Sequence, residues 1–164
     1  MTHNPTKQDA YYIVEMLEST LITTRDTQRW SEQIIKEQDE PIAWVCVVAS
    51  KSYHGDIVSA VREYAYSEPF NDRPEDLDKF HVGCLWVRYE RGELSWATFL
   101  NKAGEYLDSE NGEWFCETPY HYLNLVEEKN FTQQVEEQTK VEYLKEQNVV
   151  PWAELANSKL QWFR

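Results

Sequence analysis

Two pairs of residues have types and spacings that acid–base or nucleophilic chemistry uses. His54 and Asp56 flank a single glycine and have the types of a proton-transfer or metal-binding pair. Asp56 is also well placed to cap a helix, which is the simpler interpretation. Cys116 and His121 lie five residues apart and have the types of a nucleophile and its base. That chemistry also needs an orienting group and an oxyanion site, and spacing supplies neither.

Metal chemistry has one further candidate, the pair Asp78 and His81, which would share one face of a helix. No matching ligand pair occurs elsewhere, and the four histidines are spread over the whole chain. The five glycines are isolated, so they form no phosphate-binding loop, and neither GxSxG nor HExxH occurs. We therefore predict that the protein is not an enzyme and uses no cofactor or metal.

The least ordinary bulk property is a net charge of −13 over 164 residues. Such a charge disfavours direct binding to nucleic acid or anionic lipid, because both are repelled over a Debye length. It favours fast association with a basic partner. The alternative explanation is that the acidic surface only keeps the protein dispersed.

The charge is concentrated in one part of the chain. Between residues 105 and 146, eleven acids face only three lysines, so this window supplies −8 of the −13. Trp114 lies within this acidic window, and an exposed tryptophan with an acidic rim has the composition of a binding hot spot. The predicted partner-binding residues are Glu105, Asp108, Glu110, Glu113, Trp114, Glu117, Glu127 and Glu128.

Composition predicts one folded domain over residues 1–164. Hydrophobic residues make up 41% of the chain and aromatic residues 14%, which disordered chains lack. No apolar run is long enough for a membrane span, and the polar start has no signal-peptide core, so we expect a cytoplasmic protein or one delivered without a Sec signal. The three cysteines, an odd number, are Cys46, Cys84 and Cys116. Each has apolar neighbours, as buried reduced thiols do.

Hydrophobic periodicity predicts a mainly α-helical, compact multi-helix bundle. Thr6 is placed to cap a first helix. A second helix is expected to begin near Thr24 or Asp26 and to end in "EQDE". Pro41 then fits the first turn of a third helix. The following run, residues 42–50, is apolar except for Ser50, so periodicity does not separate a buried strand from a buried helix.

Helix signals continue through the rest of the chain. Gly92 is expected to close one helix, Ser95 to cap the next, and Thr132 to start a polar one. Trp162, near the end, is either docked on the core or exposed, and docking is the simpler interpretation. The tryptophans on apolar stripes, expected in the core, are Trp30, Trp44, Trp86 and Trp96.

An α+β fold is the alternative, with a β-meander over about residues 82–117. Leu85, Val87 and Tyr89 alternate as strand residues do, and "ERGE", "NKAG" and "ENGE" would be the turns. In this interpretation the Asn-Gly pair of the last turn marks a hairpin.

The order of features from about Tyr12 to Phe131 resembles small helical bacterial proteins of the polymorphic-toxin immunity type. The shared pattern is a first helix, a Trp-bearing second helix, an acidic "DEP" joint and a Trp-bearing third helix, followed by "DIVSAVREY" and "LWVRYERGELSWATFL". The segment "GEYLDSENGEW" and the tail after Phe131 depart from it. The resemblance implies helices in both ambiguous segments, and it carries over no catalytic residues.

Three functional hypotheses follow. The first, which we favour, is a non-enzymatic acidic binding protein, an immunity or antitoxin-type inhibitor that occludes a basic toxin or nuclease domain. The second is a nucleic-acid mimic, a phage or mobile-element protein that inhibits a DNA-binding enzyme. The third is a small enzyme that uses Cys116 or His54. The sequence leaves the oligomeric state open.

Overall fold

The fold is mainly α-helical. The computed structural model describes residues 4–164, except for the side chain of residue 71. This part of the chain contains nine α-helices, two 3-10 turns and no strand, which confirms the mainly α class. In chain order the elements are α1 Lys7–Glu18, α2 Thr24–Glu37, α3 Ala43–Ser50, α4 His54–Ala65, η1 Phe70–Asp72, α5 Leu77–Glu90, α6 Trp96–Asp108, α7 Glu117–Glu128, α8 Gln133–Glu146, α9 Val150–Lys159 and η2 Leu160–Phe163.

The alternative β-meander over residues 82–117 is therefore wrong. These residues form most of α5, all of α6 and the start of α7. The "ERGE" turn signal marks the end of a helix, since Gly92 has φ 72° and its N–H donates to Tyr89 O at 2.9 Å. The "ENGE" signal lies in the loop between α6 and α7. Gly92 thus ends α5, because glycine tolerates the left-handed conformation at a helix end, whereas "NKAG" lies within α6.

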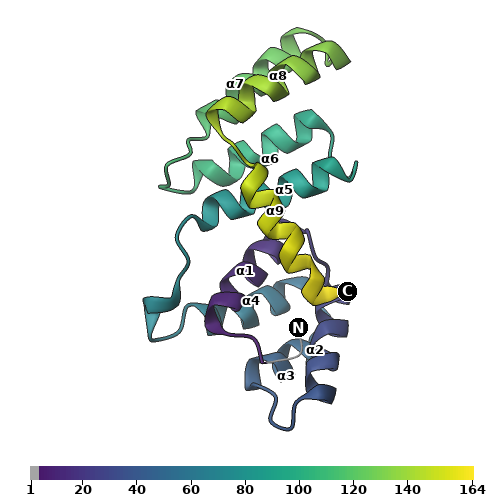
Figure 1. The fold of residues 1–164 in the computed structure, drawn as a ribbon, viewed down its shortest axis with the longest axis vertical. Coiled ribbons are helices and arrows are strands. Elements are labelled where there is room, and N and C mark those ends of the chain that lie inside the picture. The colour runs from purple at the N-terminus through teal and green to yellow at the C-terminus, as the bar shows by residue number, and fades with distance from the viewer. Residues whose placement is uncertain (1–3) are drawn as a thin grey trace. The chain divides into compact units, whose positions relative to one another are not determined.

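The chain divides into two compact units (Figure 1). The first unit comprises Met1–Leu77 and Asn157–Arg164, and the second comprises Asp78–Ala156. The prediction that residues 1–164 form one domain stays a prediction.

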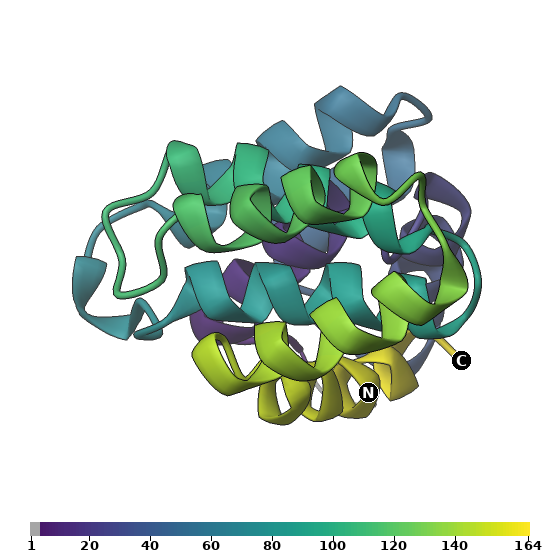
Figure 2. The ribbon, with the colours of Figure 1, turned by 90° about the horizontal axis from the view of Figure 1, so that it is seen from above.

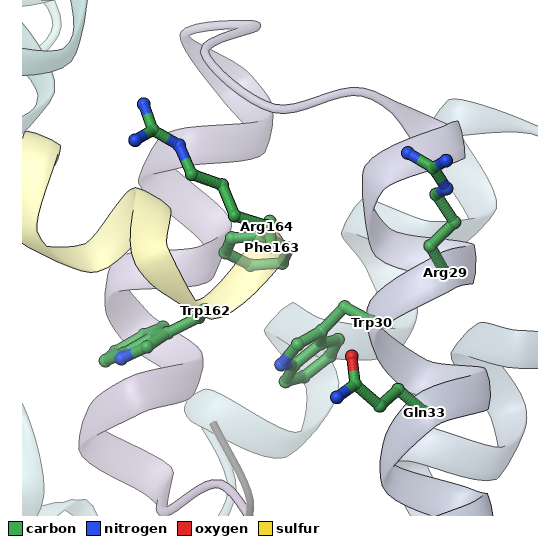
Figure 3. A pocket seen from close by; sticks show the side chains of 6 residues that line it. All are labelled: Arg29, Trp30, Gln33, Trp162, Phe163 and Arg164. Carbon is green, nitrogen blue, oxygen red and sulfur yellow. The ribbon is translucent and has the colours of Figure 1, made fainter.

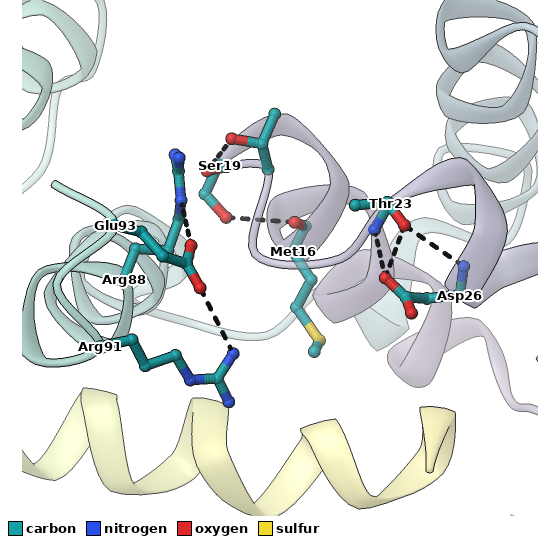
Figure 4. A network of polar contacts seen from close by, with 8 residues as sticks. Met16, Ser19, Thr23, Asp26, Arg88, Arg91 and Glu93 are labelled. Atoms are coloured by element: carbon teal, nitrogen blue, oxygen red, sulfur yellow. Dashed lines mark hydrogen bonds and ion pairs between the residues drawn. The ribbon is translucent and has the colours of Figure 1, made fainter.

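Two helices of the first unit begin with capping boxes. Thr6 and Asp9 satisfy each other's backbone N–H groups at the start of α1, which confirms the expected cap. Thr23 and Asp26 do the same for α2, with distances of 2.7 Å and 3.4 Å (Figure 4). Each such cap stabilises its helix by about 1 kcal/mol. Within this unit α1 packs on α4, and α3 packs on both α2 and α4.

Two expected helix starts in this unit are wrong by a few residues. Pro41 precedes α3, whose N-cap is Ile42 and whose first helical residue is Ala43. Asp56 is not a cap, because α4 already begins at His54 and Asp56 lies within its first turn. A carboxylate is favourable at either position, since it meets the positive end of the helix dipole, so sequence alone does not separate the two.

A row of aromatic rings forms the core of the first unit. The ring of Trp30 lies 5.8 Å from that of Trp44 and 5.4 Å from that of Phe163, and Trp44 stacks on Tyr64 at 5.2 Å. Trp30 and Trp44 are buried, as expected. The last 3-10 turn is thereby fixed to α2, although the two residues in contact are more than a hundred positions apart in sequence.

The second unit is a helical bundle around a second aromatic cluster. α6 packs on α7, and α7 packs on α8 with the two helices antiparallel (Figure 2). Trp86, Trp96, Phe99 and Tyr143 lie within 6.4 Å of one another, ring centre to ring centre. Trp86 and Trp96 are buried, which confirms the prediction for both.

Caps and ion pairs fix the turn between α5 and α6. Ser95 accepts a hydrogen bond from Thr98 N at 3.1 Å, which confirms the expected cap of α6. Within this turn, Arg88 Nε donates a hydrogen bond to the carboxylate of Glu93 at 3.1 Å. The guanidinium of Arg91 forms a longer ion pair with the same carboxylate, at 4.0 Å (Figure 4).

Polar contacts hold the otherwise hydrophilic α8 against the bundle. Only Thr139 and Tyr143 are buried on this helix. The indole of Trp96 donates to Thr139 Oγ1 at 2.9 Å, and Tyr89 OH donates to Glu136 at 2.9 Å. None of the helices described is long and apolar enough to cross a membrane.

Candidate functional site

The close approach of α6 and α7 organises the densest part of the acidic window. A side chain at Gly104 would place its Cβ 2.5 Å from the ring of Tyr120, so only glycine allows this spacing. The end of α6, the loop over residues 109–116 and the first turn of α7 form what we name the α6–α7 junction, residues 105–120.

The junction contains six of the eight predicted partner-binding residues. They come from the last turns of α6, the loop and the start of α7, and are Glu105, Asp108, Glu110, Glu113, Trp114 and Glu117. Glu127 and Glu128 lie instead at the other end of α7, about 15 Å away along the helix. The predicted set therefore falls into one cluster and one separate pair.

Two neutral groups, an amide and a thiol, contact three carboxylates of the junction. Asn101 Nδ2 donates to Glu105 at 3.0 Å. The thiol of Cys116 lies 3.5 Å from Asp108 Oδ1 and 3.6 Å from Glu117 Oε2. A neutral donor does not cancel the charge of a carboxylate, and the single S–H proton of Cys116 donates to Asp108 or to Glu117 but not fully to both.

Lys79 ties the middle of the junction to α5. Its ammonium is largely buried and lies 2.6 Å from the exposed carboxylate of Glu113. It also lies 5.8 Å from the centre of the Trp114 ring, a cation–π distance. Glu113 and Trp114 therefore share an internal cation, which reduces the charge that Glu113 presents to a partner.

The electrostatics of Cys116 are unfavourable for a nucleophile. Desolvation, the hydrogen bond to Asp108 and the charge of Glu117 all raise the pKa of its thiol. A raised pKa lowers the fraction of thiolate, which is the reactive form. The ring of His121 packs edge-on against Tyr122, 5.1 Å away between centres.

The same acidic field acts on the neighbouring tyrosine. Desolvation and the charges of Asp108 and Glu105 raise the pKa of Tyr120. Both carboxylates are thus close enough to act on one phenol, although they lie on α6 and the phenol lies on α7.

The metal candidates from the sequence do not assemble. His81 is buried and stacks flat on Tyr106, with ring centres 3.6 Å apart. Asp78 lies beneath the loop, where any side chain at Gly112 would collide with it. Over residues 4–164, no group of three His, Cys, Asp or Glu side chains could hold a metal ion.

Two exposed apolar residues lie beside the acidic residues and were not predicted from the sequence. Phe115 is 66% exposed within the junction, and Val141 is 56% exposed on α8. Val141 lies in a shallow hollow that Glu137 and Glu142 also line. Phe115 lies in an irregular loop, where no periodicity signals which side chain faces outward; its position between Glu113 and Glu117 was the available signal.

The first unit contains a separate hollow of about 220 Å³ with aromatic walls. Trp30, Trp162 and Phe163 line it, together with Gln33 and two arginines, Arg29 and Arg164 (Figure 3). Trp162 is half-buried, and the ammonium of Lys159 lies 4.3 Å from its ring. Docking, the simpler expectation for Trp162, is thus partly met.

Comparison with protein-family models, with curated protein sequences and with solved structures gives no match.

Proposed function

We propose that the protein is a non-enzymatic inhibitor of immunity or antitoxin type, which binds a basic toxin or nuclease domain through the α6–α7 junction. The observation that carries this proposal is the cluster of exposed carboxylates Glu105, Asp108 and Glu117, which an amide and a thiol contact. Around them, eleven acids face three lysines between residues 105 and 146.

Such carboxylates bind the cationic side chains of a basic partner well. A carboxylate forms short, charge-assisted hydrogen bonds with Arg or Lys of a partner, and a neighbouring donor that already orients it reduces the side-chain entropy lost on binding. The surrounding negative field accelerates the encounter with a basic surface. The exposed ring of Phe115 supplies an apolar anchor beside these charges.

A nuclease domain fits this chemistry better than nucleic acid does. Nucleic-acid-binding surfaces carry Lys and Arg to neutralise phosphates, and the junction has the opposite charge. An inhibitor that covers such a surface excludes the substrate without any reaction of its own. We place this inhibitor in the cytoplasm, where a nuclease toxin meets its substrate.

The test compares two double variants with equal changes in charge. We expect Glu105→Gln with Glu117→Gln to raise the Kd for the partner at least tenfold and to reduce its salt dependence. Glu127→Gln with Glu128→Gln, at the other end of α7, is the matched control and should change the Kd less than threefold. Glutamine preserves shape, so the comparison isolates charge.

The partner for this assay is the protein that co-purifies from the native host, identified by mass spectrometry and then produced alone. Binding is measured by calorimetry at several salt concentrations. If the first double variant binds as tightly as the control, the junction is not the interface. A nucleic-acid mimic would instead displace DNA from several unrelated DNA-binding proteins.

A further inference from the structure

The outer face of α3 is apolar and uncovered. This helix buries Trp44, Val45 and Val48 against its neighbours. Its other face is exposed, with the spacing i, i+3, i+4, i+7 of one helical stripe, and consists of Ala43, Cys46, Val47 and Ser50.

This face lacks the charged residues that solvent-facing helices normally carry. Between Pro41 and Ser50 the chain has no charged side chain, and Val47 is 42% exposed. In the same unit, the exposed positions of α2 include Glu32, Lys36 and Glu37. Water contact with an apolar helix stripe is unfavourable, so a molecule that covers the stripe stabilises the protein.

Opposite charges lie at the two ends of this face. The exposed acids Asp39 and Glu40 precede α3, and Lys51 follows it. Asn4 fixes the acidic end through Glu40 O at 2.9 Å and Ile42 N at 3.0 Å. The amide of Gln28 fixes the basic end through Lys51 O at 2.8 Å.

We propose that a second copy of this chain covers the face, with the two α3 helices antiparallel about a twofold axis. A twofold axis reverses the helix, so the acidic end of each copy meets the basic end of the other, and the two helix dipoles oppose. A partner that is complementary to both ends must place a basic group opposite the acidic end and an acidic group opposite the basic end. A second α3 helix, rotated about the twofold axis, has its charges in that order.

The register follows from the exposed residues. Their midpoint lies between Cys46 and Val47, so Ala43 of one copy faces Ser50 of the other and the two Cys46 residues are neighbours. All four side chains are small, which allows the helix axes to approach to about 8 Å. At that spacing the two Cys46 Cα atoms come within the 4–7 Å or so that a disulfide requires.

The contact is expected to be weak. Eight residues of helix span about 12 Å. An interface of that length buries less than about 1,000 Å² in total, which is the size of transient associations. The dimer therefore forms at high protein concentration. It lies in the first unit and does not depend on the function proposed for the second.

Native Cys46 provides the first test. The 164-residue protein is oxidised mildly at several hundred micromolar, and the expected product is a covalent dimer of 19.5 kDa chains on a non-reducing gel. Cys46→Ser should abolish it, whereas Cys84→Ser and Cys116→Ser should not. Glu63→Cys in the Cys46→Ser background is the control for random collision, and we expect it to cross-link at least tenfold more slowly.

Charge reversal provides the second test, by sedimentation velocity. Lys51→Glu should raise the dissociation constant of the dimer about threefold or more, because like charges then meet at both ends. Adding Asp39→Asn and Glu40→Lys should restore dimerisation, since each copy then has a basic end before α3 and an acidic end after it. Cross-linking at the control rate, or a triple variant as weak as Lys51→Glu, would overturn the proposal.

Discussion

The hydrogen bond between Trp96 and Thr139 allows a quantitative test of how α8 is held. Both residues are buried, with exposed fractions of 2% and 6%, and the indole nitrogen lies 2.9 Å from Thr139 Oγ1. Thr139→Val keeps the volume and removes the acceptor, which leaves the Trp96 N–H buried without a partner. That desolvation costs about 1–3 kcal/mol, while helix propensity is almost unchanged.

The expected result is a loss of about 2 kcal/mol of unfolding free energy, or a Tm lower by about 4–8 °C for a chain of this length. Urea unfolding followed by tryptophan fluorescence measures it. The control is a double-mutant cycle with Trp96→Phe, which has no N–H, so Thr139→Val should cost at least about 1 kcal/mol less in that background. An equal cost in both backgrounds refutes the reasoning.

Two further predictions concern the packing and titration of α7. Gly104→Ala should destabilise the protein by about 1–3 kcal/mol, because the new methyl group meets Tyr120, and Tyr120→Ala should relieve most of that cost in chemical denaturation. Burial and a hydrogen bond to Glu146 raise the pKa of Tyr122 to about 12, above the 10.0 of an unperturbed phenol. The unfolded state therefore loses this proton at a lower pH than the folded state does. The contribution of Tyr122 to the unfolding free energy is fully present below about pH 10 and is lost as the pH rises to about 12. Tyr122→Phe should show a shallower fall in Tm over this range, and an unchanged slope would contradict the assignment.

Local signals predicted most of the helices because they act within a few residues. Thr6, Gly92 and Ser95 each occupy the position that their sequence context predicts, since a cap depends only on the next turn of backbone. The four core tryptophans were predictable because each lies on an apolar stripe, and such a stripe marks the face of a helix that packs on the core.

Predictions failed where the signal was ambiguous within one segment. In α3 every residue from Ala43 to Ala49 is apolar, so the pattern could not indicate which face meets water, and Cys46, expected to be buried, is exposed. Glu113 stays a predicted partner-binding residue, and what the sequence did not indicate is its ion pair with Lys79, thirty-four positions earlier in sequence. Contacts at that separation depend on how the helices pack, which composition does not encode.

The separation in sequence of the closing contacts has a consequence for biosynthesis. Phe163 packs on Trp30 in the first unit, and in the second unit the backbone of Trp152 leaves no room for a side chain at Gly83. Neither set of helices is therefore complete until the ribosome has added residues beyond position 150, at about 5–20 residues per second. The nascent chain keeps both aromatic clusters partly uncovered for several seconds, and chaperones are expected to bind it during that interval.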